Sequence, residues 1–493
     1  MTTEAEELAI DPAAGRPDSE SARPDDRIDD ERHDRENRLK PEYVRTVREA
    51  LAADDRTTVY ALVEPLHPAD IADLLELLEP AERNHLAAAI TDLMSGEVIA
   101  ELNDYVREDM MEALDADTVA AIAEQLETDD AVQLLEDLDG PERQAVLDAL
   151  DPEDRHPIES ALAYPEETAG RLMNREFVAV PVHLTVGDLI DFLREQRDLP
   201  DEFYEVFVVD AAHHPVGTCQ LSAILRTPRA VPLAEVMKRD QTLIPVGMDQ
   251  EEVALMFQKY ALISAAVVDE NGRLVGQMTV DDVLHIVSAE AQEDTMLLSG
   301  AGEGDINEPI RDSYKARVRW LLANLLTAAV ASTVISNFED VIAAMVALAV
   351  LMPIVAGIGG NAGTQTLAVT VRALATNQLT ASNTWRAVRR EMSIAILNGG
   401  TVAVVIGLAV SVLFGTWDGW SLVEPNTSLG AVIAMAMMAN ILIAGFAGVF
   451  VPLTLEKMRI DPAIASSIFV TMTTDSMGFL VFLGLAKAAG LTG

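Results

Sequence analysis

The stretch "FVTMTTDSMGFLVFL", residues 469–483, places a carboxylate in the most apolar part of the chain. Asp475 is the only charged residue in the run 464–486. A helix needs about 20 apolar residues to cross a bilayer, and an ionised side chain at its centre costs roughly 2.5–3.5 kcal/mol. Acids inside a membrane usually mark ion pathways, so the sequence predicts that Asp475 binds a permeating cation.

Asp475 has a structural alternative to this role. A single aspartate can instead hydrogen-bond to the hydroxyl of Thr473, Thr474 or Ser476 inside a helix bundle. A homodimer favours the role of Asp475 in an ion pathway, because a two-fold axis brings two copies of Asp475 together. Two-fold dimers are the commonest closed oligomers. Two carboxylates around a water-filled axis can hold a hydrated dication that neither holds alone.

Five apolar segments follow Arg311, and each approaches or exceeds the length that crosses a bilayer. They cover residues 320–335, 341–371, 392–414, 429–455 and 464–486. Basic residues precede the first segment and lie in the loops after the second and the fourth, whereas the other two loops hold none. The positive-inside rule then puts the N-terminal 310 residues in the cytoplasm and the C-terminus outside the cell membrane.

The second segment contains "PIVAGIGGNAGTQT", residues 353–366. Pro353 and the four glycines predict a broken helix, which is tolerated at membrane depth only where protein or water satisfies the backbone. Asn361, Thr364 and Gln365, with the neighbouring Thr366, would then offer oxygen ligands to an ion. Close helix packing through small residues is the alternative, and it explains the glycines but not the polar cluster.

Charge is distributed unevenly along the 493 residues, whose formal net charge is −45. Residues 1–310 hold 71 acids and 24 bases, whereas the rest holds 9 acids and 11 bases. A polyanionic N-terminal part argues against nucleic acid as a partner, and it favours metal cations, high salt or a merely solubilising surface.

Cys219 is the only cysteine, so the chain has no intramolecular disulfide and no cysteine-based zinc site. Residues 1–37 are polar and acidic and predict a disordered tail.

Residues 38–168 predict an acidic helical domain. Segments such as "ADIADLLELLEP" and "TVAAIAEQLETDD" repeat leucine or isoleucine at helical spacing, with acids between them and Pro or Gly breaks at their ends. This pattern is typical of an α-superhelix. It supports no catalytic site, and the chain has no P-loop motif, so we expect no enzyme activity.

An internal repeat follows within residues 169–296. "FVVDAAHHPVGTCQLSAIL" (207–225) aligns with "AVVDENGRLVGQMTVDDVL" (266–284) at an offset of 59 residues. Each copy predicts strand, helix, strand, turn, strand and helix, with Asn271-Gly272 as the hairpin turn of the second copy. The two copies resemble a tandem pair of CBS domains, which commonly dimerise and often bind adenine nucleotides.

An acid-rich helix ends the repeat, in "VDDVLHIVSAEAQEDTM". Hard dications take oxygen ligands, and magnesium keeps several waters, so it needs few direct carboxylates and no tight motif. The helix is therefore a candidate divalent-cation sensor. The alternative is that these acids form only a solvated face of the helix, as runs of acidic residues usually do. Residues 297–319 predict a linker and a basic, plug-like connecting helix that links sensor motion to the membrane domain, residues 320–493.

The order of these parts resembles the MgtE family of magnesium channels over about residues 40–490. The stretches "PIVAGIGGNAGTQT" and "DPAIASSIFVTMTTDSMGFLVF" resemble the signatures of that family's second and fifth spans. The resemblance implies a multidomain fold: an α-superhelical N-domain, an α+β CBS pair, a connecting helix and an all-α domain of five transmembrane helices. It also implies a homodimeric, magnesium-selective channel that cytosolic magnesium closes.

The resemblance assigns residues to three groups. The implied pore ligands of magnesium are Asp475, Asn361 and Asp461, and the implied pore segment includes Gly359, Gly360, Thr364 and Gln365. The implied cytosolic sensor residues are Asp282, Glu290, Glu293, Asp294, Glu251, Asp129, Asp130 and Glu97. The resemblance also allows ATP or another adenine nucleotide at the CBS pair.

Other functions remain open at this point. A coupled carrier of magnesium, cobalt or manganese is the closest rival, and flux that persists without a sodium or proton gradient would favour the channel. A magnesium-sensing membrane protein that transports nothing does not explain Asp475. A CBS-regulated anion channel predicts more spans and basic anion sites, and the sequence offers neither.

Overall fold

The computed structural model describes residues 32–34, 36–112, 114–136, 138–196, 199–200, 203–300, 307–380, 382–418 and 421–491. The chain divides into two compact units, the first ending at Glu159 and the second beginning at Ser160. Of the tail expected over residues 1–37, residues 1–31 and 35 lie outside this description.

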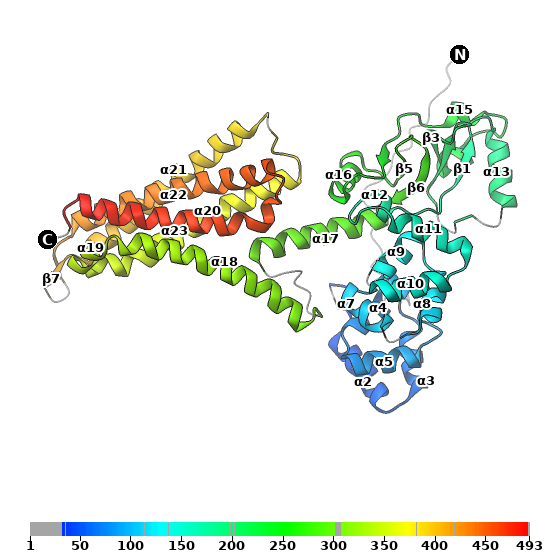
Figure 1. Ribbon diagram of the computed structural model, residues 1–493, viewed down its shortest axis with the longest axis horizontal. Coiled ribbons are helices and arrows are strands. Elements are labelled where there is room, and N and C mark those ends of the chain that lie inside the picture. Colours follow the sequence, from blue (N-terminus) through cyan, green and yellow to red (C-terminus); the bar gives the residue numbers. More distant parts are fainter. Residues whose placement is uncertain are drawn as a thin grey trace, which may run out of the picture. The chain divides into compact units, whose positions relative to one another are not determined.

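The first unit is helical, as the sequence predicts (Figure 1). Its helices are α2 (Pro41–Ala52), α3 (Arg56–Val63), α4 (Pro68–Glu76), α5 (Pro80–Ala89), α6 (Gly96–Ala100), α7 (Asp104–Met111), α8 (Ala116–Ala123), α9 (Thr128–Glu136), α10 (Gly140–Ala149) and α11 (Pro152–Leu162), which runs on into the second unit. Side-chain caps start several of them: Asp55, Asn103 and Asp115 each accept a hydrogen bond from a backbone N–H in the first turn.

Two helix pairs of this unit repeat each other at an offset of 60 residues. "LLELLEPAER" joins α4 to α5, and "LLEDLDGPER" joins α9 to α10. In each pair an arginine of the second helix reaches back to the end of the first: Arg83 Nε donates to the carbonyl of Leu75, and Arg143 Nε to that of Leu135. The arginines thereby satisfy carbonyl groups that a helix end leaves without partners.

The second unit begins with the repeated α/β modules. The first holds β1 (Ala179–Pro181), α13 (Val186–Glu195), β2 (Glu205–Val209), β3 (Pro215–Gln220), α14 (Leu221–Arg226) and α15 (Leu233–Val236). The short helix α12 (Ala169–Leu172) precedes them in the chain but packs in the core of the second module. The second holds β4 (Leu243–Pro245), α16 (Gln250–Tyr260), β5 (Ser264–Val268), β6 (Leu274–Thr279) and α17 (Val280–Ser299). Each module contains a three-stranded sheet, in the orders β1-β2-β3 and β4-β5-β6, with one parallel and one antiparallel pairing.

The strand register confirms the repeat residue by residue. Glu205 lies opposite Gln220 in the first sheet, and Ser264 lies opposite Thr279 in the second, so both partners shift by 59. The expected turn is also present, because Gly272 has a φ of +77° and its N–H donates to the carbonyl of Asp269. Glycine suits this backbone conformation since it has no Cβ to clash.

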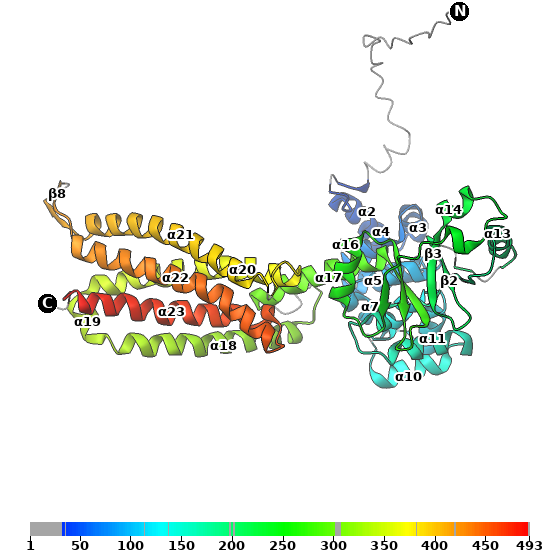
Figure 2. The same ribbon diagram turned by 90° about the horizontal axis from the view of Figure 1, so that it is seen from above.

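The remaining helices form the apolar bundle, in which the long helices lie side by side (Figures 1 and 2). They are α18 (Ile310–Ser336), the short α19 (Glu339–Ala344), α20 (Val346–Ala375), α21 (Thr384–Leu413), α22 (Thr427–Lys457) and α23 (Pro462–Ala488), with a hairpin of β7 (Thr416–Asp418) and β8 (Ser421–Glu424) between α21 and α22. Within the described residues, five of these helices are long and apolar enough to cross a membrane, which confirms the predicted spans. α22 is the central element and packs against α20, α21 and α23.

The structure corrects one prediction about the second span. A broken helix is expected at Pro353, but α20 runs without interruption from Val346 to Ala375. The backbone departs from helical geometry earlier, at Met345 between α19 and α20. A proline inside a spanning helix is tolerated because neighbouring helices satisfy the backbone group that it frees.

The glycines of this span serve close packing instead. A Cβ on Gly359 would lie 2.1 Å from Nδ2 of Asn440 on α22, and one on Gly363 would lie 2.7 Å from a methyl carbon of Val470 on α23. Small residues at these positions let the helix backbones approach each other. The packing alternative from the sequence therefore accounts for Gly359 and Gly363.

The connecting segment also differs from the expectation. Residues 311–319 do not form a separate helix but begin α18, which continues into the first span. The contact with the bundle comes from the other side of the linker: Leu297 and Leu298, at the end of α17, pack against a buried cluster formed by α20 and α23. The described part of the linker resumes at Asn307.

Candidate functional site

Asp475 lies midway along α23 and is half-buried. The neighbouring threonine hydroxyls turn back to their own helix: Thr473 donates to the carbonyl of Phe469, and Thr474 to that of Thr471. Across the residues that the structure describes, Asp475 forms neither a hydrogen bond nor an ion pair. The hydrogen-bonded alternative from the sequence is thus not realised in this chain.

The two motifs singled out in the sequence meet in space. Gly363 on α20 faces α23, where a Cβ on that glycine would lie 3.3 Å from a methyl carbon of Thr474, the residue before Asp475. The helix that carries Asp475 therefore packs directly on the glycine-rich part of α20.

One face of α20 remains uncovered in the single chain. Pro353, Gly357, Asn361, Thr364 and Ala368 recur every three or four residues and are all exposed. Residues at this spacing share one face of a helix. Between Pro353 and Ala368 the side chains of this face are small and its centre is polar, whereas Val346 and Val350 continue the same row with exposed apolar side chains. Asn361 and Thr364, two of the expected pore residues, therefore lie together.

Gly360 and Gln365 complete the expected pore segment. A Cβ on Gly360 would meet no atom within 4 Å, so the backbone is open there, and its carbonyl accepts a hydrogen bond from the hydroxyl of Thr364. Gln365 lines a cavity shared by α20, α21 and α22.

Two polar residues of the bundle have no place in the sequence-based prediction. Asn440 on α22 is fully buried and donates from Nδ2 to the carbonyl of Val355 at 2.9 Å, while its Oδ1 has no hydrogen-bond partner among the described residues. Glu391 on α21 is 7% exposed and pairs with Arg390. Two signals in the sequence could have identified these residues. Asn440 is an asparagine in the most apolar stretch of the fourth span, and Glu391 is an acid directly after a run of basic residues.

Asp461 lies at the N-terminus of α23. It caps the helix, since its Oδ1 accepts a hydrogen bond from the N–H of Ala463 at 2.8 Å, and it is exposed. A carboxylate at this position is favourable because the N-terminus of a helix carries a partial positive charge. Asp461 thus has a structural role whether or not it meets an ion.

The acids of α17 lie in differing surroundings. Asp282 belongs to a capping box with Thr279 at the start of the helix. Burial raises the pKa of the Asp282 carboxyl above its usual range, against the lowering effect of the Thr279 hydroxyl. Burial also raises the pKa of Glu290, although Gln250 on α16 donates a hydrogen bond to it. Both acids are therefore costly to ionise without a further positive partner.

Of the other expected sensor residues that the structure describes, Glu251 shares a side-chain hydrogen bond with Glu290. Glu251 at the start of α16 and Glu293 on α17 are exposed, and the side chain of Asp294 lies outside the description. Glu97 on α6 and the pair Asp129 and Asp130 on α9 belong to the first unit. Among the described residues, no group of three or more His, Cys, Asp or Glu side chains gathers closely enough to hold a metal ion.

Two contacts join α17 to the bundle. The first is the packing of Leu297 and Leu298 against the cluster that includes Leu367 of α20 and Val470 of α23. The second is at Gly300, which ends α17 with a φ of +67° and lies so close to Trp320 of α18 that a Cβ would be 2.2 Å from the indole ring. The end of α17 is thereby in contact with α18, α20 and α23.

Comparisons with known families agree with these features. Residues 352–485 match the family described as MgtE, divalent cation transporter. Residues 66–167 match the MgtE intracellular N domain, and residues 233–289 match the CBS domain.

Individual proteins are also similar. The chain is 33% identical to the magnesium transporter MgtE of Enterococcus faecalis over 67% of this chain and 71% of the relative. It is 34% identical to the magnesium transporter MgtE of Thermus thermophilus over 67% of this chain and 72% of the relative. A solved structure, the cytosolic domain of the Mg²⁺ channel MgtE in complex with ATP, is 30% identical, covers 49% of this chain and 99% of its own, and superposes with a TM-score of 0.46.

Proposed function

We propose, from the premise that this chain belongs to the MgtE family of divalent cation transporters, that it conducts magnesium ions across the cell membrane as a homodimeric channel. Named relatives that are magnesium transporters support the choice of ion. The chain is a transporter and not an enzyme in this proposal. The observation that carries it is Asp475, an acid in an apolar helix with no protein partner among the described residues.

Asp475 is the proposed binding group for the permeating ion. Leaving an ionised carboxylate at membrane depth is unfavourable unless water or a cation accompanies it. Magnesium prefers oxygen ligands and retains several of its waters, so a carboxylate in a wet conduit suits it without a closed cage of protein ligands. Asn361 and Thr364, on the uncovered face of α20, would contribute neutral oxygens. Asp461 would meet the ion near the end of the conduit.

A second copy of the chain completes the conduit in this proposal. The uncovered face of α20, with Gly357, Asn361 and Thr364, is small and polar, which is unsuited to contact with lipid tails. A two-fold axis beside this face would pair it with its copy and bring both Asp475 residues to one pathway.

The loop charges support an orientation with residues 1–310 in the cytoplasm. The sensor acids would then meet the magnesium that has entered the cell. At low magnesium, the like-charged domains of the two copies repel each other, and the pore is open. At high magnesium, ions bridge facing carboxylates, and α17 holds α20 and α23 closed through Leu297 and Leu298. Magnesium shifts this equilibrium because the closed state offers it more carboxylates.

The CBS pair would add a nucleotide-dependent input. Its two sheets repeat with the same register. We include ATP or a related adenine nucleotide here as a regulator, so that its addition should change the magnesium concentration at which flux stops.

Flux through purified protein in liposomes tests the proposal. We expect inward magnesium flux that persists without a sodium or proton gradient, and that falls when magnesium is raised on the side of residues 1–310. Flux that requires a counter-ion gradient would replace the channel with a coupled carrier. No magnesium flux under any gradient would overturn the proposal.

A further inference from the structure

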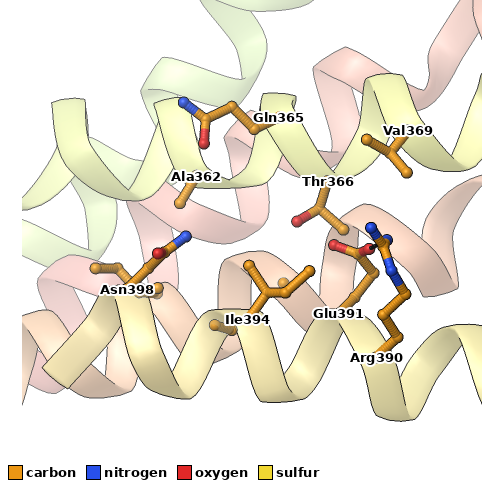
Figure 3. Close-up of a pocket in the computed structure, with 11 residues that line it drawn as sticks. Ala362, Gln365, Thr366, Val369, Arg390, Glu391, Ile394 and Asn398 are labelled. Carbon is orange, nitrogen blue, oxygen red and sulfur yellow. Dashed lines mark hydrogen bonds and ion pairs between the residues drawn. The ribbon is translucent and has the colours of Figure 1, made fainter. Parts of the chain in front are cut away.

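A second polar site lies in the bundle, away from the uncovered face of α20. It is a groove between α20 and α21 with α22 as its floor, and it has a volume of about 190 Å³ (Figure 3). Glu391 points from α21 toward Thr366 of α20, with the guanidinium group of Arg390 beside its carboxylate. Gln365 and Asn398 line the groove further along.

The groove and the uncovered face lie on different sides of α20. Successive residues of a helix are about 100° apart, which follows from 3.6 residues per turn. The groove residues Ala362 and Thr366 thus point about 100° or more away from Asn361 and Thr364, whereas Gln365 lies at the boundary of the two faces, about 40° from Asn361. The groove is therefore a separate feature from the conduit proposed for Asp475.

Glu391 is the residue that needs a cation. Its side chain is 8% exposed, and a buried carboxylate is stable only when paired. Its ion-pair partner is the adjacent residue, Arg390, although successive residues on a helix do not face each other. Arg390 must bend across the helix surface to reach the carboxylate, and its own side chain remains 64% exposed. The arginine can therefore turn out to water when another cation takes its place.

The neutral residues indicate that the groove holds water. Gln365 and Asn398 are both exposed in the chain. Asn398 lies seven residues beyond Glu391, or about 10 Å deeper along α21. Gln365 lies seven residues, again about 10 Å, from Arg372 at the basic end of α20. Amide groups at such depth require polar partners, which lipid tails do not provide.

The volume suits a hydrated ion. A water molecule occupies about 30 Å³ in the liquid, so the groove has room for several waters around an ion. Magnesium keeps several waters and is held by one or two carboxylates. One buried carboxylate with amide and hydroxyl oxygens around it matches that requirement.

We propose that the groove between α20 and α21 is a second divalent-cation site, in which Glu391 binds hydrated Mg²⁺ and Arg390 occupies the carboxylate when the ion is absent. Gln365, Thr366 and Asn398 contact the ion's water shell. The site stands on its own geometry and does not depend on Asp475 being the permeation site.

Cysteine labelling in the full-length protein tests the site locally. Asn398→Cys is treated with a small cationic methanethiosulfonate reagent, with and without Mg²⁺. The wild-type chain is the blank, because its only thiol, Cys219, is 1% exposed. A thiol reacts as its thiolate, so a wet groove allows labelling, whereas a groove filled with lipid does not. At about ten times its Kd, bound Mg²⁺ should slow labelling about tenfold by mass action.

Further variants show whether Mg²⁺ protects the thiol by binding at Glu391. Glu391→Gln should abolish the protection by Mg²⁺, Glu391→Asp should retain part of it, and Arg390→Gln should produce it at lower Mg²⁺. Ser382→Cys, exposed in the loop before α21 and outside the groove lining, should label at a rate that Mg²⁺ does not change. Protection should persist with Asp475→Asn, which separates this site from the proposed pore.

Three results would overturn the proposal. The first is an unreactive Asn398→Cys, which would mean a dry or lipid-filled groove. The second is labelling that Mg²⁺ does not slow. The third is equal protection with Glu391→Gln, which would mean that Mg²⁺ closes the groove from elsewhere. If Glu391→Gln does not fold, the double variant Glu391→Asp with Gln365→Leu takes its place. Loss of protection in this double variant supports the site, and full protection contradicts it.

Discussion

The side-chain amide of Asn440 on α22 donates a 2.9 Å hydrogen bond to the carbonyl oxygen of Val355 on α20. The bond joins two membrane helices at the level of Gly359 and Gly478, both of which lie against the same amide. Asn440 thereby fixes the central helix of the bundle to both of the helices that carry the proposed pore residues.

Replacing Gly359 with alanine should destabilise the bundle. The new Cβ would lie 2.1 Å from Nδ2 of Asn440, so the amide must move and its bond to Val355 is lost. Overpacking of this kind costs about 1–3 kcal/mol, which should appear as a lower unfolding midpoint in detergent. Gly484→Ala is the control, because no atom lies within 4 Å of its added Cβ. The double variant Gly359→Ala with Asn440→Ala should recover most of the stability that Gly359→Ala loses. If the two substitutions change stability additively, the contact between Gly359 and Asn440 is contradicted.

Gly300→Ala should weaken the link between α17 and the bundle. Its Cβ would lie 2.2 Å from the Trp320 ring, and its φ of +67° is unfavourable for alanine. We expect flux to stop only at a higher magnesium concentration, because α17 no longer seats on α18. Gly490→Ala has a nearly equal φ of +68° and no contact within 4 Å, so it controls for backbone strain alone. Equal effects of the two substitutions would exclude a role for Trp320.

The pH dependence of stability should report Glu290. Burial raises the pKa of this carboxyl in the folded protein, so the folded state holds its proton more tightly than the unfolded chain does. Its contribution to stability is therefore greatest below the unfolded pKa of about 4.3 and is lost as pH rises through the folded pKa. Glu290→Gln should remove this dependence and stabilise the magnesium-free protein near neutral pH.

Magnesium should act on the same group in the opposite direction. The ion binds the ionised carboxylate, and protons compete with it, so stabilisation by Mg²⁺ should be stronger at about pH 8 than at about pH 5. Thermal unfolding midpoints with and without Mg²⁺ measure this difference. A magnesium effect that is the same for Glu290→Gln as for the wild type would remove Glu290 from the sensor.

Neutralising the end of the acidic helix should leave the channel open. We expect the triple variant Glu290→Gln, Glu293→Gln and Asp294→Asn to conduct at magnesium concentrations that stop the wild type. Asp282 is left unchanged because it caps α17. The control neutralises three exposed acids of the same unit, Glu195, Asp240 and Glu270. If the control opens the channel equally, net charge rather than the α17 acids sets the response.

Local patterns were sufficient to predict much of this architecture. The offset of 59 residues predicts two equal sheets, because hairpin turns and alternating strands depend on neighbours in the sequence. The register of Glu205 and Ser264 confirms it. The five apolar runs predict five spans because length and hydropathy alone determine whether a helix crosses a bilayer.

Packing determined what the sequence could not show. Pro353 reads as a helix breaker in isolation, yet the surrounding helices keep α20 continuous. Glu391 follows directly after Arg389 and Arg390 and therefore reads as part of a charged loop, until the fold buries it. The capping role of Asp282 likewise depends on where α17 begins. For Pro353 and Glu391, packing against segments distant in the sequence overrides the local signal.

Magnesium flux through Asp475→Asn in proteoliposomes tests the central claim most directly. Thr473→Val is the matched control on the same helix, because the Thr473 hydroxyl donates only to its own backbone. We predict that Asp475→Asn lowers flux at least about tenfold, equivalent to about 1.4 kcal/mol, while Thr473→Val conducts as the wild type does. Wild-type flux through a folded Asp475→Asn protein would contradict the account.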